Sequence, residues 1–208
     1  MNAIKINNLT KSYNKHLVLE NIDLEISNDK YNFILGGNGV GKSTFIKCLL
    51  DEVKYQGSIN LNNKKISYAP ERLNLPEYIK MYDFLLLISK INGLKENTKI
   101  DQYLETFEIL KYKNYQIGKL SNGTKRKIVI IQALINNSDI YIFDEPLTGL
   151  DENSKNSFIK ELRKFKKNNK IIIIATHRLN DFKVRDKNII QFGVPNEFNE
   201  ITSKVYIR

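Results

Sequence analysis

The spacing of apolar residues changes along the chain, and each change marks a different kind of secondary structure. In the first third, short apolar or alternating runs between polar turns predict strands. These predicted strands cover residues 4–9, 16–26, 32–35, 57–61 and 65–68. From about residue 82 to residue 135 the apolar side chains recur at helical spacing, so this section is predicted to be helical.

The last third returns to continuous apolar runs. The runs at 140–143 and 171–175 are predicted to be buried strands, because they lack the alternation of a half-exposed strand. A helix is predicted over about 153–165 between them, and a final strand near 188–192. Strands that alternate with helices predict an α/β fold whose parallel sheet is covered on both faces.

The sequence shows no internal repeat and no linker, so we expect a single domain over residues 1–208. Within it we expect a β-rich portion at about 1–75, a helical portion at about 76–135 and the remainder of the core at about 136–208. Because about 15 residues follow the last predicted strand, we expect no C-terminal regulatory domain within this sequence.

Residues 36–44 follow a predicted strand and read Gly-Gly-Asn-Gly-Val-Gly-Lys-Ser-Thr, which fits the phosphate-loop pattern G-x-x-x-x-G-K-[ST]. Glycines let the backbone turn and point its N–H groups at phosphate oxygens, and a helix starting near Lys42 aims its positive end at the same anion. A plain glycine-rich turn is the competing interpretation. The expected nucleotide contacts are Gly36, Asn38, Gly39, Gly41, Lys42, Ser43 and Thr44, with the hydroxyl of Ser43 also a ligand for Mg²⁺.

Two acids, Asp144 and Glu145, end the apolar run at 140–143. The carboxyl edge of a parallel sheet is where ligands bind, so Asp144 is predicted to hold Mg²⁺ beside the phosphate loop. Strand alternation predicts that Glu145 points the other way, where it would orient or deprotonate the water that attacks the γ-phosphate. A solvated acidic turn is the alternative.

The chain has 33 basic and 23 acidic residues, a net charge of +10. This charge is compatible with nucleic acid, an anionic membrane surface or an anionic ligand, but the lysines are scattered, so a solvated surface is favoured and we expect no nucleic-acid partner. The single cysteine, Cys48, excludes an internal disulfide. No signal peptide and no apolar run near the ~18 residues of a membrane span is present, so we expect a soluble cytoplasmic chain. His16 has no motif around it and is expected to be a surface residue.

The segment Leu120-Ser121-Asn122-Gly123-Thr124 lies between the two sites and precedes a basic amphipathic stretch. At this distance upstream of Asp144 it resembles the signature motif of ATP-binding-cassette (ABC) ATPases. The resemblance covers essentially the whole chain. It implies a P-loop NTPase core with a parallel sheet, an N-terminal antiparallel β subdomain and an inserted α-helical subdomain. It also implies that Ser121 and Gly123 bind the ATP held by the opposite subunit of a head-to-tail dimer.

Further positions match the family one by one. Tyr13 resembles the aromatic residue that stacks on adenine, and His177, after a predicted buried strand, resembles the switch histidine that contacts the γ-phosphate. Leu150 and Asp151 resemble the loop that communicates across the dimer. The resemblance therefore implies ATP and Mg²⁺ as cofactors.

One departure from the family is Glu71, which stands where a glutamine is usual. A carboxylate can also ligate Mg²⁺, a hard cation that prefers oxygen, so Glu71 joins Ser43 and Asp144 as an expected metal ligand. A glutamate after a proline also resembles ATPases of exporters with separate membrane subunits. Asn122, where glycine is usual, and Thr124, where glutamine is usual, are milder departures, since Asn tolerates positive φ.

The resemblance implies an ATPase subunit that drives transport, with export of a drug, peptide or other small cargo expected, through an integral membrane permease. The chain would act as a homodimer, peripheral on the inner face of the cell membrane. A soluble ABC ATPase serving a cytosolic assembly is the alternative. A nucleotide-binding scaffold without hydrolysis is a third reading, against which the intact Glu145 argues.

Overall fold

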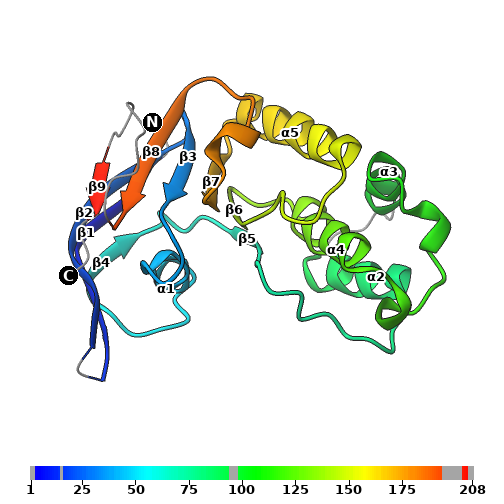
Figure 1. Cartoon of the computed structure of the whole chain (residues 1–208), viewed down its shortest axis with the longest axis horizontal. Coiled ribbons are helices and arrows are strands. Elements are labelled where there is room, and N and C mark those ends of the chain that lie inside the picture. Colours follow the sequence, from blue (N-terminus) through cyan, green and yellow to red (C-terminus); the bar gives the residue numbers. More distant parts are fainter. Residues whose placement is uncertain (1–2, 15, 94–97, 194–202, 206–208) are drawn as a thin grey trace.

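The computed structural model describes residues 3–14, 16–93, 98–193 and 203–205. Two sheets and five α-helices make up the described part of the chain (Figure 1). In the larger sheet all neighbouring strands are parallel. Its order is β5 (Ile66–Ala69), β6 (Ile140–Asp144), β7 (Ile171–Thr176), β3 (Tyr31–Leu35), β8 (Lys187–Phe192) and β9 (Ser203–Val205).

The smaller sheet is antiparallel and pairs β1 (Ala3–Tyr13) with β2 (His16–Ser27) on one side and β4 (Gln56–Asn60) on the other. The helices are α1 (Lys42–Leu49), α2 (Met81–Ile91), α3 (Thr98–Thr106), α4 (Asn122–Leu134) and α5 (Glu152–Lys167). Short 3₁₀ turns are η1 (Leu110–Tyr112), η2 (Ile117–Lys119) and η3 (Leu179–Asp181).

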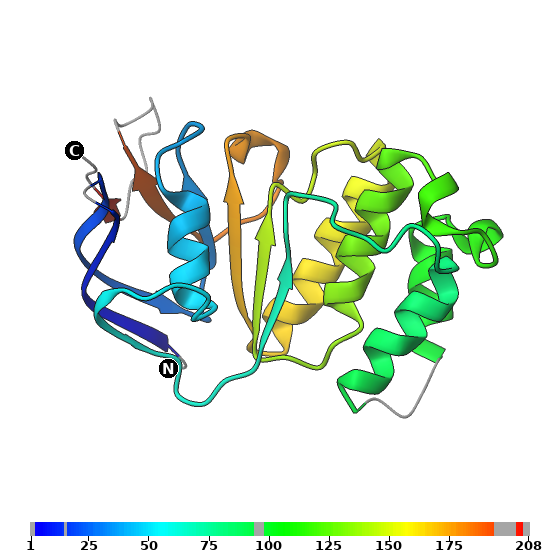
Figure 2. The ribbon, with the colours of Figure 1, turned by 90° about the horizontal axis from the view of Figure 1, so that it is seen from below.

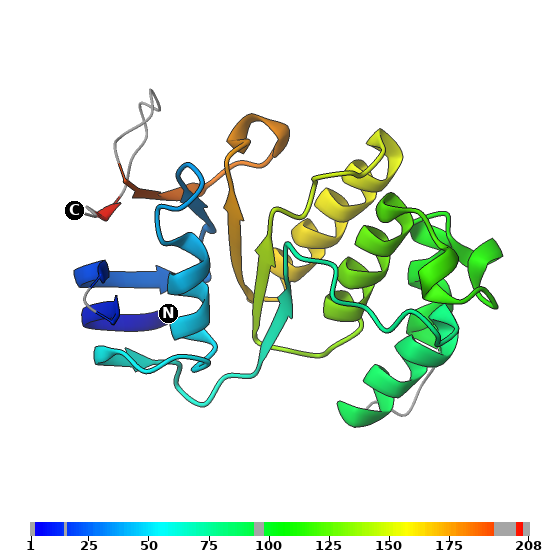
Figure 3. The same ribbon diagram turned by 60° about the horizontal axis from the view of Figure 1, so that its bottom comes forward.

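Figure 2 shows these elements as layers. The antiparallel sheet and α1 lie on one side of the parallel sheet, while α4 and α5 cover its other side. Helices α2 and α3 lie beyond α4, at the end of the molecule far from the antiparallel sheet (Figures 2 and 3). Because α2, α3 and α4 all occur between β5 and β6 in the sequence, they form a helical insertion into the strand order.

Strand alternation divides the parallel sheet between two hydrophobic cores. In β6, Tyr141 and Phe143 belong to the core shared with the helices, whereas Ile140 and Ile142 belong to the core shared with α1 and the antiparallel sheet. Strand β7 divides its isoleucines in the same way. A strand buried on both faces has no polar side, which explains why these strands read as continuous apolar runs.

The predicted α/β architecture is confirmed, with differences in detail. The predicted helical section contains three α-helices separated by 3₁₀ turns and irregular backbone. The first strand extends to Tyr13, beyond its predicted end at residue 9. The strand predicted near 188–192 is confirmed as β8, but it is not the last one, because β9 follows it and pairs with it in parallel. Within the described residues, no helix is both long enough and apolar enough to span a bilayer.

Candidate active site

The phosphate loop joins β3 to α1, and its backbone requires glycine at two points. Gly41 caps the start of α1 with φ 89° and ψ 2°, a left-handed conformation that costs glycine little. At Gly36 a Cβ atom would lie 2.7 Å from the carbonyl oxygen of Phe192, so the loop packs against the end of β8. Helix α1 begins at Lys42, as predicted.

The side chain of Lys42 lies inside the loop. Its Nζ donates hydrogen bonds to the carbonyl oxygens of Gly36 (2.7 Å) and Gly37 (2.8 Å), and the residue is buried. These bonds hold the ammonium group where the loop curls around it. A cation and the N-terminal end of α1 are therefore directed at the same space.

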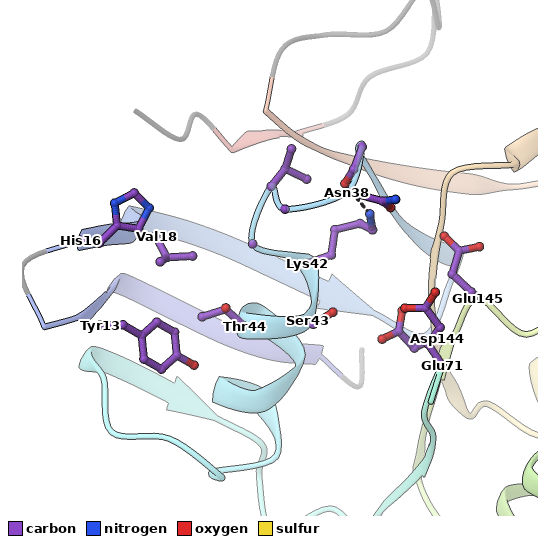
Figure 4. Close-up of a pocket in the computed structure, with 14 residues that line it drawn as sticks. Tyr13, His16, Val18, Asn38, Lys42, Ser43, Thr44, Glu71, Asp144 and Glu145 are labelled. Carbon is purple, nitrogen blue, oxygen red and sulfur yellow. Dashed lines mark hydrogen bonds between the residues drawn. The ribbon is translucent and has the colours of Figure 1, made fainter. Parts of the chain in front are cut away.

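That space is a cavity of about 450 Å³ (Figure 4). The loop forms one wall, the strand ends that carry the acids form another, and the β1–β2 hairpin closes the far side (Figure 4). Of the loop residues predicted to contact nucleotide, Gly36 does not line the cavity and instead packs against β8. The others do line it: Asn38, Gly39, Gly41, Lys42, Ser43 and Thr44.

The hairpin side of the cavity carries an aromatic ring. Tyr13, the last residue of β1, lines it with 40% of its surface exposed, and the Nζ of Lys11 lies 4.4 Å from the ring centroid. His16 and Val18 from β2 lie on the same side (Figure 4). An exposed ring at the end of a phosphate-binding cavity provides a stacking surface for a base.

His16 is exposed, as expected of a surface residue, and it also lines the cavity, which the sequence analysis did not indicate. The hairpin pairs it directly with Tyr13, and this pairing places it in the cavity wall. The two residues between Tyr13 and His16 match the length of a tight hairpin turn, which was the available signal.

Asp144 is the last residue of β6 and only 4% exposed. Burial raises the pKa of its carboxyl to about 6, the negative charges of Glu71 and Glu145 add to the rise, and Lys42 and Arg126 oppose it. The carboxylates of Glu71, Asp144 and Glu145 line one cavity (Figure 4). Their mutual repulsion would be relieved by a bound cation.

The oxygen atoms of Ser43, Glu71 and Asp144 line this cavity together, so the donor set suits Mg²⁺. Across the residues that the structure describes, no three His, Cys, Asp or Glu side chains form a ready-made metal cluster. This arrangement fits a small hard cation that keeps several waters and is bound by a few protein oxygens together with substrate phosphates.

Glu145 follows β6 and has φ 47°, a left-handed conformation that is uncommon for a residue other than glycine. The prediction that strand alternation turns it away from Asp144 was wrong, because the strand ends at Asp144 and both acids line the cavity. The carboxylate is held by the end of β7. It accepts hydrogen bonds from Thr176 Oγ1 (3.1 Å) and from the backbone N–H of His177 (3.0 Å).

The imidazole of His177 makes a further contact with Glu145, from Nδ1 to Oε1 at 2.7 Å. Arg178 Nε donates to the other ring nitrogen, Nε2, at 3.2 Å. Because an ionised carboxylate only accepts and a guanidinium only donates, these two contacts assign the neutral ring with its proton on Nδ1. The structure thus places His177 against Glu145, and its contact with a γ-phosphate stays a prediction.

Ser121 and Gly123 lie at the start of α4, and neither lines the cavity of their own chain. Ser121 caps the helix, its Oγ accepting from the backbone N–H of Thr124 at 3.2 Å. A Cβ atom on Gly123 would lie 3.0 Å from the carbonyl oxygen of Gly149, so this helix end abuts the loop after β6. Asn122 is the first residue of the helix and needs no positive φ, contrary to our reason for tolerating it there.

The loop after β6 ends at Asp151, which caps α5 by accepting from the backbone N–H of Ser154 at 2.8 Å. Its carboxylate also pairs with Lys127 of α4 at 2.7 Å. The hydrogen bond from Lys127 is the main reason why the pKa of Asp151 lies well below its ordinary range. One ion pair therefore ties the start of α5 to α4.

The fold and cavity define a nucleotide-binding cassette of the P-loop class. The ABC transporter family model matches residues 19–148. A probable ABC transporter ATP-binding protein of Cyanophora paradoxa is 30% identical over 219 residues, covering 97% of this chain and 90% of the relative. The manganese transport system ATP-binding protein MntB of Listeria innocua is 32% identical over 191 residues, covering 84% and 80%.

A solved structure has the same fold. It is the dimeric structure of a post-hydrolysis state of an ATP-binding cassette bound to ADP and phosphate. It superposes on this chain with a TM-score of 0.80 at 22% sequence identity. The superposition covers 97% of this chain and 96% of the chain in that structure. The chain belongs to the ABC transporter family.

Proposed function

We propose that this chain binds and hydrolyses Mg-ATP as the motor subunit of a transporter. One observation carries the proposal: the phosphate loop, the aromatic ring of Tyr13 and the acids Asp144 and Glu145 surround a single cavity. The cavity thus offers a stacking surface at one end and a cation and acids at the other (Figure 4).

In the proposed reaction, the loop N–H groups and Lys42 bind the β- and γ-phosphates. Ser43, Asp144 and Glu71 would hold Mg²⁺, which when bound would neutralise the negative charge that develops on the phosphates. Glu145 accepts a proton from the attacking water or orients that water. The bonds from Thr176 and His177 fix the carboxylate of Glu145, so its direction is set by β7 as well as by β6.

Replacing Glu145 by Gln tests this assignment. The variant should bind ATP as the parent does, while turnover falls by roughly 10²-fold or more because the general base is lost. Glu152→Gln is a matched control, since Glu152 is an exposed acid of α5 paired only with Lys155 in the described structure. Turnover that stays unchanged in Glu145→Gln would remove Glu145 from the mechanism.

We also propose that two chains assemble head to tail around ATP. Ser121 and Gly123 lie outside the cavity of their own chain, which suits a role toward a second copy. In sedimentation experiments, Glu145→Gln should dimerise when Mg-ATP is added and stay monomeric without it. Monomers at saturating Mg-ATP would argue against the head-to-tail arrangement.

The proposed partner is an integral membrane permease, which would place the chain on the inner face of the cell membrane. Affinity capture from solubilised membranes should recover a polytopic protein. Recovery of soluble partners alone would favour the alternative, an ABC ATPase that serves a cytosolic assembly.

Export is the proposed direction, on the basis of Glu71 after Pro70. A deletion strain should then become sensitive to toxic small molecules or peptides that it fails to expel. A growth defect cured by an added nutrient, such as the manganese of the system that one relative is named for, would contradict export.

A further inference from the structure

The guanidinium of Arg126 joins two functional segments of the chain. Arg126 lies in the second turn of α4, one turn after Ser121 and Gly123, and only 5% of its surface is exposed. Its NH1 donates to the carbonyl oxygen of Pro70 at 2.7 Å, and its NH2 donates to that of Glu71 at 2.5 Å. Both bonds are from a charged donor, which makes them stronger than ordinary hydrogen bonds.

The carbonyls of Pro70 and Glu71 belong to a segment that has no regular secondary structure to hold it in place. After β5 ends at Ala69, the chain runs without helix or strand to Met81, where α2 starts. Pro70 has no N–H to donate, and the backbone bonds between Arg72 and Leu75 are local, from the N–H of Asn74 to the carbonyl of Arg72 and from the N–H of Leu75 to the carbonyl of Leu73.

The second half of the same segment is also tied to residues just before α4. Gly118 N–H donates to the carbonyl of Glu77 at 2.8 Å, Ile117 N–H to that of Ile79 at 3.0 Å, and Met81 N–H to that of Tyr115 at 2.9 Å. Arg126 therefore holds the end of the segment nearest the cavity, at Pro70 and Glu71, and the backbone bonds hold its other end, at Glu77, Ile79 and Met81. The segment from residue 70 to residue 81 is thus joined at its start to α4 and at its end to the residues that precede α4.

We propose that Arg126 is a positioning residue that couples Glu71, at the metal side of the chain's own cavity, to the Ser121 end of α4, which faces the nucleotide of the second subunit. This inference rests on the proposed function and adds a means by which one nucleotide site affects the other. A change in the position of Glu71 upon binding of Mg-ATP is carried by the two bonds to α4. The bonds thereby position Ser121 and Gly123, at the start of α4, to contact the nucleotide bound by the second subunit.

The geometry also explains the residue type. A guanidinium reaches two adjacent carbonyls with separate nitrogens held in one plane, whereas the single ammonium of lysine is a point donor without that fork. Burial lowers the pKa of Arg126, but the nearby carboxylates of Glu71, Asp144 and Glu145 oppose that change and keep the guanidinium charged. Lysine would keep the charge and lose the fork.

The test uses the full chain carrying Glu145→Gln, with Arg126→Lys or Arg126→Met added. Arg163→Met is the matched control, because Arg163 also donates from a guanidinium to a backbone carbonyl, that of Lys183 at 3.0 Å, but lies outside the nucleotide cavity. Two constants are measured: the affinity of the monomer for Mg-ATP at low protein concentration, and the dimerisation constant at saturating Mg-ATP.

We expect monomer affinity within about twofold of the parent in every variant, while dimerisation weakens by about tenfold or more in Arg126→Met and less in Arg126→Lys. With Glu145 intact, Arg126→Lys should lower kcat while KM for ATP changes little, since the nucleotide contacts remain. If Arg126→Met fails to fold, Arg126→Lys still decides the question by the same two constants.

Dimerisation equal to that of the parent in both Arg126 variants would overturn the coupling and leave the proposed function standing. Equal losses of monomer affinity and dimerisation would also overturn it, because they indicate general damage to the cavity. A parent that does not dimerise with Mg-ATP would overturn the proposed function, and the coupling with it.

Discussion

The buried carboxyl of Asp144 should make the ligand-free protein less stable at neutral pH than a chain with a neutral side chain there. Burial and the charges of Glu71 and Glu145 raise its pKa from 3.8 to about 6. Ionising a carboxyl with such a pKa costs roughly 3 kcal/mol of folding free energy. Asp144→Asn removes the charge and keeps the shape, so at about pH 8 it should unfold at a higher temperature.

The sign of the pH dependence follows from linkage. Because the folded pKa is raised, the native state binds the extra proton between pH 3.8 and about 6, and stability falls as pH rises through this window. The full cost is present above about pH 6, and about half of it remains at about pH 5. With roughly 2–4 °C per kcal/mol for a chain of this size, the gain in Tm of Asp144→Asn should be about 6–12 °C near pH 8 and about half of that near pH 5.

Thermal unfolding followed by circular dichroism, in EDTA and without nucleotide, measures both gains. Asp139→Asn is the control at the opposite end of the same strand: Asp139 lies just before β6, is half exposed and pairs with Lys170 at 3.5 Å, so no gain is expected. Addition of Mg-ATP should then stabilise the parent more than Asp144→Asn, because the variant lacks a metal ligand. A Tm gain that is the same at both pH values, or a loss, would refute the electrostatic reasoning.

Two further changes test the other sides of the site. Tyr13→Ala should weaken ATP binding by about 1–3 kcal/mol, whereas Tyr13→Phe should preserve it, because phenylalanine keeps the ring that stacks on the base. Titration calorimetry measures both affinities. Equal affinity in the parent, Tyr13→Ala and Tyr13→Phe would exclude stacking. Asp151→Ala should lower the free energy of unfolding by about 1–2 kcal/mol, because it removes both the cap of α5 and the ion-pair partner of Lys127. Asp151→Asn should keep the cap and lose only the ion pair. Denaturant titrations of the two variants separate the loss of the cap from the loss of the ion pair.

The outline of the fold could be predicted because most of it depends on local periodicity. The β6 and β7 runs are apolar at every position since both faces are buried, and the helices of the insertion keep their apolar spacing. The order of strands was beyond such reasoning, because β3 lies between β7 and β8 through pairings over long sequence distances. Strand β9 has only three residues, too few for a periodic signal.

The same distinction applies to the site. The phosphate loop could be identified because its chemistry is contained in consecutive residues. His16 is exposed as expected, but its place in the cavity wall could not be predicted, because that place comes from hairpin pairing with Tyr13. The direction of Glu145 was wrong because alternation applies only within a strand, and the backbone leaves β6 with a positive φ at this residue. The bond from His177 to Glu145 joins the ends of two strands, which no local pattern indicates.

The division of β6 between two cores has a consequence for how this site can vary over evolution. A shift of one residue in the register of β6 would exchange Tyr141 and Phe143 with Ile140 and Ile142. The aromatic rings would then enter a core packed around isoleucine, and the isoleucines would leave cavities in the core packed around the rings. The register of the strand is therefore fixed independently of the two acids that follow it. Substitutions at 144 and 145 can change the chemistry of the cavity without moving the positions from which those side chains act.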